Sequence, residues 1–175
     1  IQIPEYIQVL IDLLNQNHYN AYVVGGAIRN ALLGLPIHDY DLTTDATPDE
    51  MLQAFSSYRL FKTGIQHGTI TVLSNGQPVE ITTFRSENTY EDHRHPSTVS
   101  FSNNIEEDCK RRDFTINALC YNKSEGLIDF FGGIEDLQHK IIRCIGNPHE
   151  RIDEDALRIL RALRFAGRLS FTIEE

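Results

Sequence analysis

Two carboxylates separated by one residue, Asp39 and Asp41, are the residues of this chain best suited to chemistry. Alternate residues of a strand point to the same face, so these side chains are predicted to project side by side. Adjacent carboxylates repel each other unless a cation lies between them, and hard divalent cations prefer oxygen ligands. The pattern indicates a metal site, with a solvated strand end as the alternative because a lone Asp-x-Asp is a weak motif.

A pair of glycines, Gly25 and Gly26, precedes these carboxylates at the junction of a predicted strand and helix. Such a junction lets backbone N–H groups approach a phosphate, and Arg29, one helical turn later, could pair with that phosphate. A tight turn explains the glycines equally well. A third carboxylate, Glu80, lies on a predicted neighbouring strand, where it either completes a metal cluster or is simply exposed. Metal and phosphate together indicate nucleotide chemistry.

Three consecutive cations, Lys110, Arg111 and Arg112, stand directly before Asp113. Successive helical residues do not share a face. One arginine could therefore turn inward, to a triphosphate or to Asp113, while the others face solvent. A solvated basic turn is the alternative, and by itself it is the favoured one.

Asp155, Arg158, Arg161 and Arg164 recur at three-residue spacing in a predicted C-terminal helix. Residues at this spacing are neighbours on a helix surface, so an ion pair with a solvated arginine stripe accounts for them. The alternative is a base-reading pair, because Asp155 accepts from an exocyclic amine and Arg158 donates to a ring acceptor. Cytosine and adenine present both groups, whereas guanine and uracil do not. The remaining arginines would then hold phosphates.

Hydrophobic periodicity and turn signals predict the elements that position these residues. Helices are predicted at 4–17, 27–33, from 47 onward, 106–121 and 148–168. Strands are predicted at 21–24, 39–43, 68–73, 78–84, 127–130 and 140–145. The polar segment 86–104 is predicted to be a long loop, and such loops are often functional. The expected fold class is α+β, a small mixed sheet with helices on one side and a final helix that leaves it.

The composition fits about one domain, since the chain has 175 residues of which 41% are hydrophobic. The net charge of −9 makes the whole chain no obvious nucleic-acid binder, although a local basic surface is compatible with it. The chain has three cysteines, an odd number, at positions 109, 120 and 144, and no Cys-x-x-Cys motif. This pattern favours a protein of the reducing cytosol over one with a disulfide framework or a zinc site. The chain has no apolar run long enough to span a membrane, so no membrane partner is expected. The oligomeric state stays open.

Five ordered motifs resemble those of the class II tRNA nucleotidyltransferase (CCA-adding enzyme) and bacterial poly(A) polymerase family. They cover nearly the whole chain and comprise residues 25–29 with 39–41, 91–96, 111–118, 129–133 and 154–161. Two positions depart from the family pattern: Asn30 follows Arg29 where the family usually has Asp, and His95 stands where an Arg is common.

The resemblance implies a polymerase-β-like nucleotidyltransferase head over residues 1–145 and the start of a helical neck over residues 146–175. It implies a cytoplasmic enzyme that adds CMP and AMP from CTP and ATP to a tRNA 3′ end by two-metal chemistry with Mg²⁺. The catalytic residues would be Asp39, Asp41 and Glu80, with metal on Asp39 and Asp41. Asp92 and Arg94 would belong to a flexible loop that helps the switch from C to A addition. The nucleotide-binding residues would be Gly25, Gly26, Arg29, Arg112, Asp155, Arg158, Arg161 and Arg164.

Two other functions fit parts of the pattern. A poly(A) polymerase of the same family, which adds AMP to RNA 3′ ends, is hardly separated from a CCA-adding enzyme by these motifs. A nucleotide-binding regulatory module without turnover is disfavoured because Asp39, Asp41 and Arg112 are all present.

Overall fold

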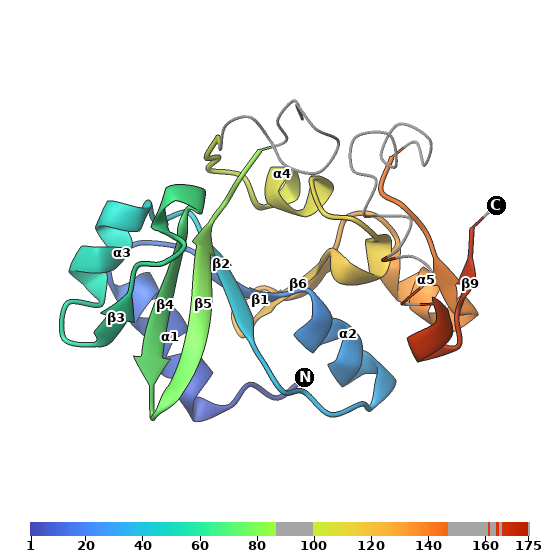
Figure 1. The fold of residues 1–175 in the computed structure, drawn as a ribbon, viewed down its shortest axis with the longest axis horizontal. Helices are drawn as coiled ribbons and strands as arrows, with labels where there is room; N and C mark the ends of the chain where they lie inside the picture. The colour runs from blue at the N-terminus through green and yellow to red at the C-terminus, as the bar shows by residue number, and fades with distance from the viewer. Residues whose placement is uncertain (87–99, 147–160, 162–163, 165, 175) are drawn as a thin grey trace.

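The fold is built on a seven-stranded mixed sheet with the strand order β3-β4-β5-β2-β1-β6-β7 (Figure 1). It is seen in a computed structural model that describes residues 1–86, 100–146, 161, 164 and 166–174. The strands are β1 (Ala21–Val24), β2 (Asp41–Thr44), β3 (Arg59–Phe61), β4 (Thr69–Ser74), β5 (Gln77–Thr83), β6 (Leu119–Asn122) and β7 (Gly126–Asp129). β2 pairs with β5 in parallel, and the other neighbours are antiparallel. The predicted α+β class with a mixed sheet is confirmed.

Besides the helical residues 161, 164 and 166–169 near the C-terminus, the described part of the chain contains five helices and two short 3₁₀ turns. They are α1 (Glu5–Gln16), α2 (Gly26–Leu33), α3 (Pro48–Ala54), α4 (Ile105–Lys110), α5 (Gly133–His139), η1 (Ile65–His67) and η2 (Thr115–Asn117). A separate two-stranded ladder joins β8 (Ile141–Ile142) to β9 (Thr172–Ile173). Within the parts of the chain that are described, no helix has the length and apolar character needed to cross a membrane.

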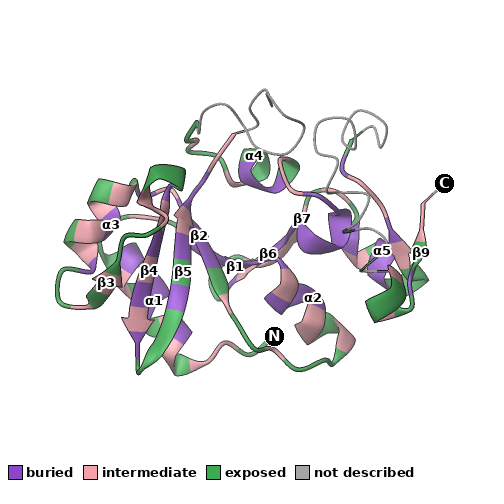
Figure 2. Cartoon of the chain, viewed as in Figure 1, coloured by how far each residue is buried: buried purple, intermediate pink, exposed green. Residues whose placement is uncertain are grey.

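The two faces of the sheet differ because alternate strand residues point to opposite sides. Along β4 and β5, buried residues alternate with less buried ones (Figure 2). The buried set, which includes Ile70, Val72 and Ile81, packs in the main core with α1 and α3. On the opposite face, Cys109 of α4 packs in a smaller cluster with Val24 of β1, so the prediction that the helices lie on one side of the sheet is wrong for α4.

Several local predictions are confirmed. The amphipathic helix predicted at 4–17 is α1, and its apolar stripe is buried. The helix predicted from residue 47 is α3, which begins with a capping box between Thr47 and Glu50. The predicted hairpin turns at Asn75 and Gly76, both with positive φ, as a two-residue turn of type I′ requires.

The prediction of one helix over 106–121 is wrong after Lys110. The Asp113 carboxylate accepts from the backbone N–H of Phe114 at 2.7 Å and from the Asn117 amide at 3.1 Å. These local bonds compete with helix continuation, and the chain passes through η2 into β6, which pairs with β1. Of the helix predicted at 148–168, residues 161, 164 and 166–168 are helical, and its other residues lie outside the described ones.

Candidate functional site

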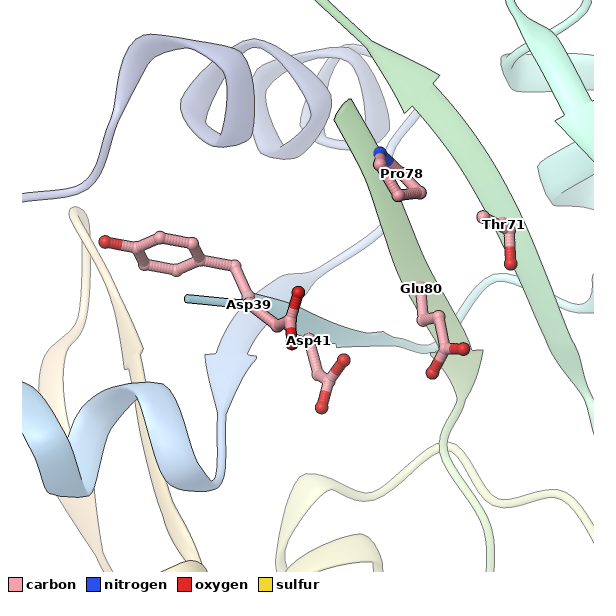
Figure 3. Close-up of a pocket in the computed structure, with 6 residues that line it drawn as sticks. Asp39, Asp41, Thr71, Pro78 and Glu80 are labelled. Atoms are coloured by element: carbon pink, nitrogen blue, oxygen red, sulfur yellow. The ribbon is translucent and has the colours of Figure 1, made fainter. Parts of the chain in front are cut away.

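Three carboxylates come together at the junction of β2 and β5. Asp41 pairs in register with Glu80 across this parallel ladder, so the two side chains lie on the same face. Asp39 lies before β2, which begins at Asp41 and not at residue 39 as predicted. All three nevertheless line one open cavity of about 320 Å³, together with Tyr40, Thr71 and Pro78 (Figure 3).

The cavity concentrates negative charge that is partly withdrawn from water. Burial raises the pKa of the Asp41 carboxyl, the charges of Glu80 and Asp39 raise it further, and Arg112 opposes them. Mutually repelling, partly desolvated oxygens are the donors that a hard divalent cation prefers. Among the residues that the structure describes, no group of three or more His, Cys, Asp and Glu side chains is arranged to hold a metal ion by itself. The oxygen donors of this cavity suit a hard divalent cation only where water or another ligand completes the coordination.

Val24, the last residue of β1, is in register with Asp41 of β2, so the turn between β1 and α2 begins next to the carboxylates. Gly25 has φ 73° and ψ −135°, a backbone conformation that is essentially restricted to glycine. A Cβ added at Gly25 would lie 3.8 Å from Nη1 of Arg112, and one at Gly26 would lie 3.2 Å from Nη2 of Arg29. Two guanidinium groups therefore flank the N-terminal end of α2.

Arg112 is held by Asp108, a fully buried carboxylate that the sequence reasoning missed. Asp108 accepts from Nη2 of Arg112 and Nε of Arg111, each at 3.2 Å. It also accepts from the backbone N–H of Arg85 at 2.9 Å and from the Thr43 hydroxyl at 3.2 Å. Burial raises the pKa of Asp108, but the two arginines and the Arg85 N–H outweigh it and leave that pKa below its ordinary value. The i, i+4 spacing of Asp108 and Arg112 is the sequence signal that could have revealed this pair.

A second network of polar contacts connects α2 to the C-terminal segment. Nη1 of Arg29 donates to Oδ1 of Asn117 at 2.6 Å, and the Asn117 amide donates to Asp113. Asp113 in turn forms an ion pair with Arg161. Burial lowers the pKa of Arg29, the nearby charge of Arg168 lowers it further, and Asp113 opposes both. These contacts link Arg29 to Arg161 through Asn117, which lies in the predicted motif 111–118, and through Asp113. Arg168 is not among the predicted site residues.

Asn30 fixes the Arg29 guanidinium from another side. Its amide oxygen accepts from Nε of Arg29 at 3.1 Å, and its amide nitrogen donates to the carbonyl of Pro36 at 3.1 Å. A carboxylate lacks the donor needed for the second bond, so the structure accounts for Asn at this position.

The structure thus gathers most of the predicted site residues that it describes. Asp39, Asp41 and Glu80 share the cavity, and Gly25, Gly26, Arg29 and Arg112 surround the adjacent turn. Arg161 reaches them through Asp113, and Arg164 is exposed on the same segment. Four predicted residues lie outside the described ones, namely Asp92, Arg94, Asp155 and Arg158.

Comparisons with known proteins identify the family to which this chain is similar. Residues 21–143 match the family model of the poly A polymerase head domain. A CCA-adding enzyme of Enterococcus faecalis is 53% identical over 162 residues, which are 93% of this chain and 39% of that enzyme.

Solved structures agree with this match. The Bacillus stearothermophilus CCA-adding enzyme in complex with CTP superposes with a TM-score of 0.88 at 39% identity, covering 98% of this chain and 42% of that one. A tRNA nucleotidyltransferase complexed with a primer tRNA and an incoming ATP analogue gives a TM-score of 0.75 at 32% identity, covering 95% of this chain and 46% of that one. The chain spans about two-fifths of the length of the curated relatives that it matches.

Proposed function

This chain belongs to the poly(A) polymerase head domain family, and from that membership we propose that it catalyses nucleotidyl transfer to an RNA 3′ end. The reaction we propose is the addition of CMP and AMP from CTP and ATP to tRNA, without a nucleic-acid template. The observation that carries the proposal is the cavity of Asp39, Asp41 and Glu80 directly beside a glycine turn flanked by Arg29 and Arg112.

Each group in this arrangement has a use in the reaction. When bound by Asp39 and Asp41, Mg²⁺ would supply charge to the phosphate oxygens and help to align the attacking and leaving oxygens. The turn at Gly25 and Gly26 lets the backbone approach a triphosphate. Arg29 and Arg112 offset the negative charge that grows on the leaving pyrophosphate.

Arg112 is suited to that task because its charge is secured. Burial alone would lower its pKa, but the neighbouring groups, above all the Asp108 carboxylate, more than offset this and leave the pKa above the ordinary value. The guanidinium also lies in a fixed position, since Nη2 donates to Asp108. A fixed cation needs little reorganisation when charge develops.

The remaining residues extend the proposal. We assign base choice to Asp155 and Arg158, phosphate contacts to Arg161 and Arg164, and the change from C to A addition to the segment with Asp92 and Arg94. The head would span residues 1–145 and the neck would start at residue 146. The enzyme would work in the cytoplasm, where ATP, CTP and tRNA are available together.

The test measures Mg²⁺-dependent binding of CTP, ATP, GTP and UTP, followed by labelled nucleotide addition to a tRNA that lacks its terminal CCA. We expect CTP and ATP to bind, and we expect this chain to extend tRNA poorly, because it spans about two-fifths of the length of its curated relatives. Asp41→Asn should abolish incorporation while nucleotide binding persists, because the fold and the arginines remain. Binding without any incorporation by the unaltered protein would instead support a regulatory module.

A poly(A) polymerase is the second candidate, because the matching family is that of the poly A polymerase head domain. It predicts that ATP alone binds and that AMP is added to RNAs of varied sequence. Incorporation of CMP from CTP excludes it as the main activity.

A further inference from the structure

The face of the sheet that carries the carboxylates extends across β5 and β4 to the edge strand β3. Residues in direct register on neighbouring strands point to the same face. Asp41 pairs with Glu80, Glu80 with Thr71, and Thr71 with Phe61, so these four form one row across β2, β5, β4 and β3. Neighbouring strands lie about 4.8 Å apart, which puts Phe61 roughly 10 Å from Glu80 along the row.

Phe61 is a large apolar side chain left in contact with water. It is 41% exposed, and the guanidinium carbon of Arg59 lies 5.5 Å from its ring centroid. Arg59 is two residues earlier, on the same face of the edge strand, and Lys62 is exposed next to Phe61. An aromatic ring with cations beside it is the combination that binds single-stranded nucleic acid, because bases stack on the ring and phosphates contact the cations.

The two sides of the carboxylate cavity carry different groups. In the strand order, β1 lies on one side of β2, and β5, β4 and β3 lie on the other. The glycine turn with Arg29 and Arg112 follows β1, whereas Phe61 lies on β3. In phosphoryl-group transfer the attacking and leaving oxygens are roughly in line. If the triphosphate occupies the β1 side, the attacking 3′-hydroxyl must arrive from the β3 side.

We propose that Phe61 and Arg59 bind the unpaired 3′ end of the RNA acceptor. The end of the RNA would then extend past Thr71, so that its terminal hydroxyl lies at Glu80 and Asp41. Bases stacked about 3.4 Å apart place the base on Phe61 about three or four nucleotides from the reacting hydroxyl. This inference rests on the proposed function, since it names where the acceptor of that reaction lies.

The test compares Phe61→Ala and Phe61→Tyr in the intact protein, with a tRNA lacking its CCA end as acceptor. We expect Phe61→Ala to raise the KM for RNA by about fivefold to 100-fold, the range for loss of one base stack. The KM values for CTP and ATP should stay within about twofold, since the nucleotide side is untouched. Phe61→Tyr keeps the ring and should retain the KM for RNA. Val9→Ala, which shortens an exposed apolar side chain of α1, is the control and should change neither KM.

A second readout is a photo-crosslink from 4-thiouridine placed three or four nucleotides from the RNA 3′ end, which should label the β3 peptide. An unchanged KM for RNA in Phe61→Ala, or labelling confined to other peptides, overturns this inference while nucleotide addition itself stands. If the unaltered protein adds no nucleotide and binds neither CTP nor ATP, the proposed function fails first, and that result is distinguishable from a defect of Phe61→Ala alone.

Discussion

Asp108→Asn removes the charge that holds two arginines beside the candidate site. Asp108 is fully buried, whereas the side chains of Arg111 and Arg112 are 20% and 19% exposed. Removal of one partner from a buried ion pair costs about 3–5 kcal/mol of unfolding free energy, because a buried charge is left without compensation. Partial exposure of the arginines puts the expected loss near the lower end, about 3 kcal/mol. That is a large fraction of the 5–15 kcal/mol typical of a whole domain.

The assay is urea unfolding at several pH values, with Glu107→Gln as the control. Glu107 is the exposed neighbour of Asp108 on α4, so both variants lose one negative charge. Since the folded-state pKa of Asp108 is depressed, its contribution is fully present above the unfolded carboxyl pKa of about 3.9. It disappears as the pH falls through the lower folded-state value. The stability gap between unaltered protein and Asp108→Asn should therefore be full at pH 7 and should close in acid.

Two results would refute this reasoning. Equal stability of Asp108→Asn and Glu107→Gln at pH 7 would mean that the buried charge does not hold the arginines. A gap that stayed constant through the acid range would mean that it arises from packing, not from ionisation of Asp108. If the reasoning is right, Asp108→Asn also weakens CTP and ATP binding, because Arg112 loses its fixed position.

Three further outcomes are expected. Gly25→Ala should lower the unfolding free energy by about 1–3 kcal/mol, because the backbone at this position is strained for any residue with a Cβ, and thermal unfolding measures the loss. Arg29→Lys keeps the charge but loses the planar contacts to the two asparagines, so calorimetry should show CTP binding weakened by about tenfold, with unchanged affinity as the contrary result. In the folded chain Cys144, which is half-buried, should be alkylated before Cys109 and Cys120, because these two are buried with their sulfurs 3.0 Å apart and the pKa of the Cys120 thiol is raised. Mass spectrometry of peptides resolves this order, and simultaneous labelling of all three thiols contradicts it.

The parts of the site that could be predicted from the sequence depend on short-range signals. Asp39 and Asp41 are close in sequence, and the Gly25 turn directly joins a strand to a helix. The hairpin that carries Glu80 has a strong turn signal at Asn75-Gly76. Such features are set by backbone geometry within a few residues, so pattern reasoning reaches them.

The parts that could not be predicted depend on partners distant in sequence. Helix α5 is one example, although its first turn is capped locally by Asp129, which accepts from the N–H groups of Gly133 and Ile134 at 2.8 and 3.0 Å. Gly133 itself approaches Thr115 so closely that a Cβ would lie 2.3 Å from the Thr115 carbonyl oxygen. Strand β3 has only three residues and is defined by its pairing with β4. Neither element has a periodic pattern of its own.

Buried ion pairs explain how an acidic chain can present arginines at the candidate site. Asp108 and Asp113 are buried, and their contacts include Arg111, Arg112 and Arg161. Part of the net charge of −9 is therefore used internally to hold arginines in place. A long side chain that is already ordered loses less conformational entropy when it binds a phosphate. In the proposed function, the buried acids would favour triphosphate binding by ordering the arginines, while partly neutralising the attraction between those arginines and the triphosphate. Bound Mg²⁺ would supply additional positive charge at such a site.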